Sequence, residues 1–164
     1  MPGGNPLYYW DACLFLAWLK DEQRKAGEMD GVRDIIQRMK RRDVKIMTSV
    51  LTMVEVLSAK IPVGMDTLFK DLMKRLNRQS MDIRVASIAH DLRNHYVISG
   101  VRTLKSPDAI HLATAILYRA DEFHTFDDQL SSLSGNVGGH RLIIYKPETK
   151  SPQLDLRKPN QDES

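Results

Sequence analysis

Leu7-Tyr8-Tyr9-Trp10-Asp11 is the stretch of sequence that decides the fold, because it is a short apolar run that ends on a carboxylate. Such a run predicts a buried β-strand over Leu7–Trp10. A helical pattern, Ala12–Lys25, follows directly, and strands that alternate with helices form a mainly parallel sheet covered by helices. Ligands of such sheets bind outside the carboxyl ends of the strands. The topology therefore places Asp11 at the edge where a site forms.

Strand-like and helix-like segments alternate through the rest of the chain. The further predicted strands are Val44–Met47, Met81–Val85, Phe123–Phe126 and Leu142–Tyr145. The further predicted helices are Gly31–Arg42, Val50–Lys60, Met65–Leu76, a segment that ends near Ile98, Ser106–Arg119 and Gln129–Leu133. This order predicts an α/β fold, a three-layer α/β/α sandwich with a short, mainly parallel sheet. The apolar stripe of Met65–Leu76 serves either core packing, which we favour, or the docking of a partner chain.

The chain has 164 residues, of which 42% are hydrophobic and 27% are charged. These values are ordinary for one globular domain with a substantial core. From Pro147 onward the sequence is rich in Pro, Lys, Asp and Gln and has no apolar periodicity. We therefore expect a domain over residues 1–146 and a disordered tail over residues 147–164.

Signals for export or membrane insertion are absent from the sequence. The longest apolar run, Cys13–Leu19, is too short to span a bilayer. The N-terminal residues Met1–Asn5 lack the basic and apolar regions of a secretory signal. A single cysteine, Cys13, cannot form an internal disulfide, which fits a reducing compartment. We expect a cytoplasmic protein without membrane contact.

The chain is mildly basic, with 24 Lys and Arg against 21 Asp and Glu. Two basic clusters stand out, Lys40–Arg42 and the group Lys74, Arg75 and Arg78. Such clusters can bind a phosphate backbone, whose contacts dominate the affinity of nucleic-acid binding. The alternative is a solvated helix face, which we favour for either cluster taken alone, and Lys40–Arg42 can oppose the negative end of a helix. Both interpretations stay open.

Four acidic residues lie in apolar surroundings that suit a metal ligand: Asp11, Glu55, Asp108 and Asp127. Burying a lone carboxylate is unfavourable unless a partner or a metal neutralises it, so four such residues suggest one shared site. Carboxylate ligands suit Mg²⁺ or Mn²⁺ better than zinc.

Each acid also has a purely structural interpretation, which for Glu55 is an exposed position on an amphipathic helix. Asp11 can cap the helix that begins at Ala12, and Asp108 can favour the helix dipole in a first turn. Asp127 or Asp128 can cap the helix after them. Glu55 lies mid-helix in the predicted Val50–Lys60, where neither a cap nor the dipole explains it. Only the occurrence of all four acids in one small domain favours a shared metal site.

The motifs around these acids resemble those of PIN-domain nucleases. That family has an acid after the first strand, a Glu in the helix after the second, an Asp that opens a late D-A-x-x-x-A helix, and a T-x-D segment after the fourth strand. The corresponding segments are Tyr9-Trp10-Asp11, Thr52-Met53-Val54-Glu55-Val56-Leu57, Ser106-Pro107-Asp108-Ala109-Ile110-His111-Leu112-Ala113 and Thr125-Phe126-Asp127. The resemblance extends from Leu7 to Tyr145. Its T-x-D register favours Asp127 as the ligand, with Asp128 as the alternative ligand or a cap.

One departure from the family concerns the residues after the first acid. The family usually has Thr or Ser there to support the metal site, whereas this chain has Ala12 and Cys13. Other catalytic patterns are missing: the sequence has no phosphate-binding G-x-x-x-x-G-K-[ST], no G-x-G-x-x-G and no zinc-binding spacing of its five histidines. His111 lies one turn after Asp108, and we interpret it as a structural histidine.

The resemblance implies a Mg²⁺- or Mn²⁺-dependent endoribonuclease, similar to the VapC-type toxin of a bacterial type II toxin–antitoxin pair. Its implied partners are an RNA substrate, a cognate antitoxin protein and a second copy of the chain. One alternative is a PIN-fold RNA-processing nuclease that has no antitoxin. Another is a non-catalytic module of the same fold that binds nucleic acid or protein.

Overall fold

A five-stranded parallel sheet forms the centre of the computed structural model, which describes residues 3–21 and 27–147. The strand order is β3-β2-β1-β4-β5, and each neighbouring pair is parallel. The strands are β1 (Leu7–Trp10), β2 (Lys45–Ser49), β3 (Asn77–Gln79), β4 (Glu122–His124) and β5 (Ile144–Tyr145). This architecture confirms the predicted α/β class and its parallel sheet.

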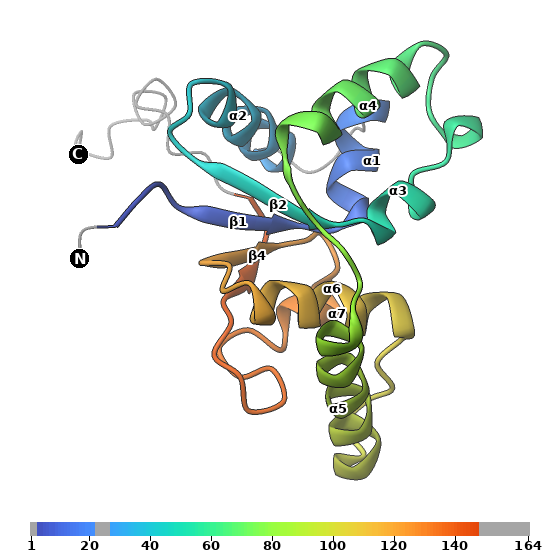
Figure 1. Ribbon diagram of the computed structural model, residues 1–164, viewed down its shortest axis with the longest axis vertical. Coiled ribbons are helices and arrows are strands. Elements are labelled where there is room, and N and C mark those ends of the chain that lie inside the picture. Colours follow the sequence, from blue (N-terminus) through green and yellow to red (C-terminus); the bar gives the residue numbers. More distant parts are fainter. Residues whose placement is uncertain (1–2, 22–26, 148–164) are drawn as a thin grey trace, which may run out of the picture.

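Helices cover both faces of the sheet (Figure 1). One face carries α1 (Ala12–Lys20), α2 (Glu28–Lys40), α3 (Leu51–Glu55) and α4 (Met65–Arg75). The other carries α5 (Ile83–Ser99), α6 (Ser106–Leu117) and α7 (Asp128–Ser131). A short 3₁₀ helix, η1 (Ser58–Lys60), lies between α3 and α4. The predicted three-layer sandwich is therefore correct.

The alternation of side chains along β1 explains why its sequence is apolar throughout. Successive side chains of a strand point to opposite faces of the sheet. Tyr8 and Trp10 belong to the core under α1, α2 and α4, whereas Tyr9 belongs to the core under α5 and α6. The central strand is thus buried on both faces, as expected for a parallel sheet.

Two predicted helices are shorter than expected. The helix predicted over Ala12–Lys25 ends at Lys20, where Asp21 adopts a left-handed backbone with φ 48°; residues 22–26 lie outside the described residues. The helix predicted over Val50–Lys60 ends at Glu55, because the backbone of Val56 turns away and buries its side chain in the core. Glu55 is therefore the last residue of a five-residue helix rather than a mid-helix residue.

The strand predicted over Met81–Val85 was wrong. Asp82 caps α5 there, and its Oδ1 accepts hydrogen bonds from the amides of Arg84 and Val85 at 3.0 and 3.2 Å. The real strand is β3, which pairs with β2 at one edge of the sheet. Its residues, Asn77-Arg78-Gln79, are polar, so apolar periodicity gave no sign of an edge strand.

The structure bears on two questions that the sequence left open: whether Met65–Leu76 packs in the core or docks a partner, and where the two basic clusters lie. Phe69, Leu72 and Met73 of α4 are buried in the core, which confirms core packing for this stripe. Lys40 lies in the last turn of α2, and Lys74 and Arg75 lie in the last turn of α4, where cations oppose the negative helix end.

Residues 148–164 of the predicted tail lie outside the described residues. No helix in the described part of the chain is long and apolar enough to cross a membrane.

Candidate functional site

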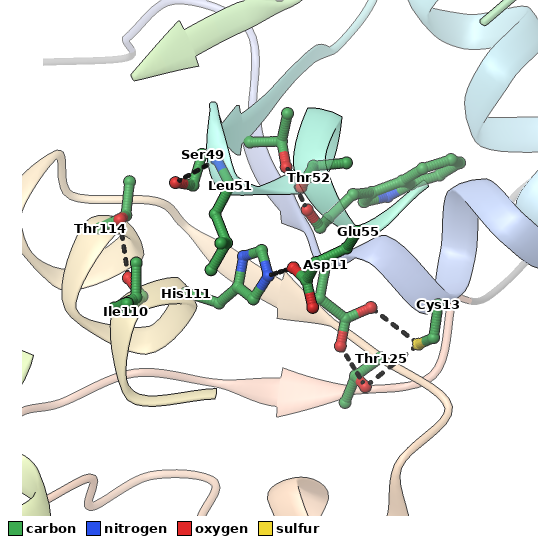
Figure 2. A network of polar contacts seen from close by, with 12 residues as sticks. Asp11, Cys13, Ser49, Leu51, Thr52, Glu55, Ile110, His111, Thr114 and Thr125 are labelled. Carbon is green, nitrogen blue, oxygen red and sulfur yellow. Dashed lines mark hydrogen bonds and ion pairs between the residues drawn. The ribbon is translucent and has the colours of Figure 1, made fainter. Parts of the chain in front are cut away.

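Asp11 lies directly after β1 and is 7% exposed. Its Oδ1 accepts a hydrogen bond from Cys13 Sγ and its Oδ2 accepts one from Thr125 Oγ1, each at 2.7 Å (Figure 2). Asp11 occupies the N-cap position of α1, but its side chain makes no capping hydrogen bond to the helix. Burial raises the pKa of Asp11, and the Cys13 and Thr125 hydrogen bonds oppose that rise. Asp11 is therefore a buried acid held in one orientation by two side chains.

Glu55 is joined to the sheet through His111. The Tyr9 hydroxyl accepts from the Ser49 amide at 3.1 Å and lies 2.5 Å from His111 Nδ1. Nε2 of the same ring lies 2.5 Å from Glu55 Oε1. When Nε2 carries the proton, it donates to Glu55, and Nδ1 accepts from the Tyr9 hydroxyl.

The network brings Glu55 to the same edge of the sheet as Asp11. Figure 2 shows the two residues near one another, with the Glu55 carboxylate directed at His111 and the Asp11 carboxylate directed at Cys13 and Thr125. The ring of His111 is 2% exposed and stands between segments of β1, α3 and α6. We expected a structural histidine, and the structure shows that it also positions a candidate ligand.

Asp108 lies in the first turn of α6 and is half-buried. Burial raises its pKa, and the negative charges of Asp127 and Asp11 raise it further. Among the described residues its carboxylate has no hydrogen-bond or salt-bridge partner. Asp108 is thus an acid near two other acids, without a direct hydrogen-bond or ion-pair partner, and His111 and Lys105 only partly oppose the rise of its pKa.

Asp127, and not Asp128, caps α7. Asp127 Oδ1 accepts from the amides of Gln129 and Leu130 at 2.8 and 3.4 Å. The Asp127 amide donates to Thr125 Oγ1 at 3.1 Å, which ties the segment to the side chain that also holds Asp11. Asp128 is a first-turn acid whose side chain is 84% exposed and forms an ion pair with Lys146 at 3.2 Å. The sequence left the cap open between Asp127 and Asp128, and the structure assigns it to Asp127.

The four acids are oxygen donors of high negative charge, which fits a hard divalent cation. The mutual repulsion that raises the pKa of Asp108 is an interaction that such a cation would relieve. Within residues 3–21 and 27–147, no three His, Cys, Asp or Glu side chains are already close enough to enclose a metal. The carboxylate oxygens therefore match the ligand preference of Mg²⁺ or Mn²⁺, but the four side chains do not already form a closed coordination shell.

The sequence model of the PIN domain family matches residues 8–136. The chain belongs to the PIN domain family. No curated protein matches it. Among solved structures, this PIN domain is similar to a toxin–antitoxin complex from Klebsiella pneumoniae, with 21% identity, a TM-score of 0.58 and coverage of 85% of this chain and 97% of that one.

Two further solved structures share the fold at lower identity. The VapBC2 complex from Rickettsia felis, bound to a fragment of its promoter DNA, has 12% identity and a TM-score of 0.63, with 84% of this chain and 98% of that one covered. VapC20 from Mycobacterium tuberculosis, a toxin that cleaves the sarcin–ricin loop, has 12% identity and a TM-score of 0.57, with coverage of 81% and 98%. The PIN domain of this chain therefore has the architecture of these VapC-like proteins.

Three residues at the site were not predicted as part of it: Cys13, His111 and Thr125. The thiol of Cys13 contacts Asp11, although the family usually has a hydroxyl residue near this acid. Thr125 contacts both Asp11 and the Asp127 amide. The position of Thr125 in the T-x-D segment is the one sequence feature that could have predicted its role at the site. For His111 the only such feature is its spacing of one helical turn from Asp108.

Proposed function

We propose that this PIN domain is a Mg²⁺- or Mn²⁺-dependent endoribonuclease that acts as the toxin of a type II toxin–antitoxin pair. The observation that carries the proposal is the unpartnered carboxylate of Asp108, whose pKa is raised by burial and by the charges of Asp127 and Asp11. Acids whose pKa is raised by burial and by neighbouring charges are characteristic of functional sites. The hydrogen-bonded Glu55 adds a fourth acid on the same edge.

Asp11, Glu55, Asp108 and Asp127 would hold the metal. When bound, Mg²⁺ or Mn²⁺ supplies an activated water and stabilises the charge of a phosphate undergoing in-line attack. The chain's own contribution is to orient the ligands. Thr125 and Cys13 hold Asp11, His111 holds Glu55, and two amides of α7 hold Asp127. Partners of this kind fix ligand geometry in metal sites.

RNA is the substrate that we propose. The fold is shared with a toxin that cleaves the sarcin–ricin loop, which is an RNA target. Single-stranded or looped RNA suits the site, because its backbone can enter a cleft that a stiff duplex cannot. The net charge of +3 also favours a polyanionic substrate, despite the acids gathered at the site.

An antitoxin is the protein partner that we propose, since several similar structures are toxin–antitoxin complexes. Exposed apolar side chains near α3 and α4, among them Val54 at 69% exposure and Val63, support a surface that a partner covers. Co-expression with the product of the neighbouring gene should give a co-purifying complex and relieve growth arrest. A chain that purifies alone and leaves growth unaffected would favour an RNA-processing nuclease instead. Light scattering of the purified chain tests the expected homodimer.

The decisive test is an RNA cleavage assay with a matched pair of variants. Purified protein is incubated with mixed cellular RNA in Mg²⁺, in Mn²⁺ or in EDTA, and the products are separated by gel electrophoresis. We expect cleavage only with metal. Asp108→Asn should reduce it to the EDTA background, whereas Asp128→Asn, the same change at an exposed acid, should cleave as the wild type does. Metal-dependent cleavage that survives Asp108→Asn, or no cleavage by the wild type, would contradict the proposal.

A further inference from the structure

A pocket of about 500 Å³ lies on the α7 side of the candidate site. It is formed where the loop between α5 and α6 meets α7, and its lining is Val101, Arg102, Thr103, Gln129, Ser132 and Leu133. The volume falls in the range of roughly 300–1,000 Å³ that is usual for small-molecule sites. The lining combines one cation and three polar side chains with two apolar ones, so it suits a ligand that has both charged and flat apolar parts.

Arg102 is the charged residue of this pocket, and it is not neutralised. Its guanidinium donates to the carbonyl oxygen and to the Oε1 of Gln129, the latter at 3.0 Å. No carboxylate within the described ranges forms a salt bridge with it, and its Nε is buried without a hydrogen-bond partner. A buried donor without a partner is unfavourable, and an anionic ligand that draws the guanidinium to itself would relieve this.

Gln129 connects the pocket to the acidic site. Its amide donates to Asp127 Oδ1 at 2.8 Å, while its carbonyl and side-chain oxygens accept from Arg102. One residue therefore separates a candidate metal ligand from the unneutralised cation. The pocket and the acidic site are therefore linked through α7, since Gln129 lines the pocket and also donates to Asp127.

The acidic site by itself repels a polyanion. Phosphate contacts supply most of the affinity of proteins for nucleic acids, so a nuclease with four gathered carboxylates needs cations nearby. Arg102 is such a cation, and Lys105, which precedes α6, lies close enough to oppose the pKa rise of Asp108. A guanidinium binds phosphate through two parallel hydrogen bonds, which also sets the orientation of the strand.

We propose that this pocket is a subsite for one nucleotide of single-stranded RNA that flanks the scissile phosphate, with Arg102 bound to the phosphate of that nucleotide. This proposal rests on the proposed nuclease function, because the subsite has a role in cleavage only if the protein cleaves RNA. Binding of RNA at the pocket can nevertheless be measured without cleavage.

The test measures binding of a short, fluorescein-labelled single-stranded RNA by fluorescence anisotropy, in EDTA, over a series of salt concentrations. Arg102→Ala should raise the Kd about tenfold, because it removes a charge-assisted contact. It should also reduce the slope of log K against log salt by about 0.7, the value for one phosphate contact to a single strand. Arg102→Lys should keep the slope. The control is Arg33→Ala, which removes the same charge from an exposed ion pair on α2 and should change neither quantity.

A second pair of variants changes the pocket wall without replacing Arg102 or Gln129. Thr103→Glu places a negative charge in the pocket wall and should weaken RNA binding, whereas the isosteric Thr103→Gln should not. Equal binding by Thr103→Glu and Thr103→Gln, or a Kd for Arg102→Ala equal to that of Arg33→Ala, would overturn the subsite. A weaker Kd for Arg102→Ala with an unchanged salt slope would overturn the phosphate contact.

Cleavage assayed in parallel in Mn²⁺ separates this proposal from the proposed function. If the wild type cleaves RNA and the pocket variants bind and cleave as it does, the subsite is wrong and the nuclease function stands. If no protein cleaves RNA but binding depends on Arg102 as described, the nuclease function is wrong and the binding site stands.

Discussion

His111 Nε2 lies 2.5 Å from Glu55 Oε1, although 56 residues separate the two along the chain. The contact joins the helix that carries Asp108 to the end of the helix that carries Glu55. The other ring nitrogen of His111 lies 2.5 Å from the hydroxyl of Tyr9, the residue two before Asp11. One imidazole thus couples three segments that contribute candidate metal ligands.

We predict that His111→Ala lowers metal-dependent RNA cleavage by about 10–100-fold, because Glu55 loses the donor that orients it. His111→Gln, which keeps a side-chain donor, should recover part of the activity. The exposed His90 of α5 provides the control, and His90→Ala should cleave as the wild type does. Cleavage rates measured at several Mn²⁺ concentrations check this. Unchanged rates and metal dependence in His111→Ala would show that its role is structural only.

The raised pKa of Asp108 predicts a dependence of stability on pH in the absence of metal. Because the folded-state pKa lies above the ordinary value of 3.8, the folded protein holds this proton more tightly than the unfolded chain does. Asp108 therefore destabilises the fold increasingly as the pH rises through the window from 3.8 to the folded pKa, and the full effect remains above it. Asp108→Asn should have a higher melting temperature than the wild type at pH 7 in EDTA, and this gain should shrink toward pH 4. Melting curves across that range measure it, with Asp128→Asn as the control. A gain that does not change with pH would contradict the assignment.

The capping geometry of Asp127 predicts a separation between stability and cleavage. Asp127→Ala should lose about 0.5–2 kcal/mol of unfolding free energy, because it removes the cap of α7, and it should lose cleavage. Asp127→Ser keeps a capping oxygen but removes the carboxylate, so it should retain stability and still lose cleavage. Asp128→Ala removes only an exposed ion pair and should change stability by less than about 1 kcal/mol. Urea unfolding and RNA cleavage of the three variants check this. Full cleavage by Asp127→Ser would remove Asp127 from the metal site.

Thr125 holds two parts of the site through one hydroxyl, which donates to Asp11 and accepts from the Asp127 amide. Thr125→Val has nearly the same shape but leaves both groups without that partner. We expect a loss of about 1–3 kcal/mol of unfolding free energy, together with a higher Mn²⁺ concentration for half-maximal cleavage. Thr125→Ser should restore both. A Thr125→Val variant that matches the wild type in metal requirement would show that Asp11 does not need this contact.

Local sequence patterns were sufficient to predict much of the fold. The apolar run before Asp11 and the apolar helix of Ser106–Leu117 were both identified, because burial on two faces leaves a continuous apolar signal. The polar edge strand Asn77–Gln79 was missed because only one of its sides is paired in the sheet and its side chains are not core residues. The end of α3 at Glu55 was missed because the burial of Val56 in the core, and not helix propensity, ends that helix.

The sequence by itself determined which acids are candidates and that Asp11 follows a central strand, since residue type and strand order are local properties. Only the tertiary structure decided how those acids are held. The contacts of Asp11 with Thr125, and of Glu55 with His111, span 114 and 56 residues of sequence. No periodicity encodes such contacts, because they depend on the register of parallel strands and on where each helix ends. The cap of α7 is a local contact, and Asp127 rather than Asp128 makes it because the helix begins at Asp128.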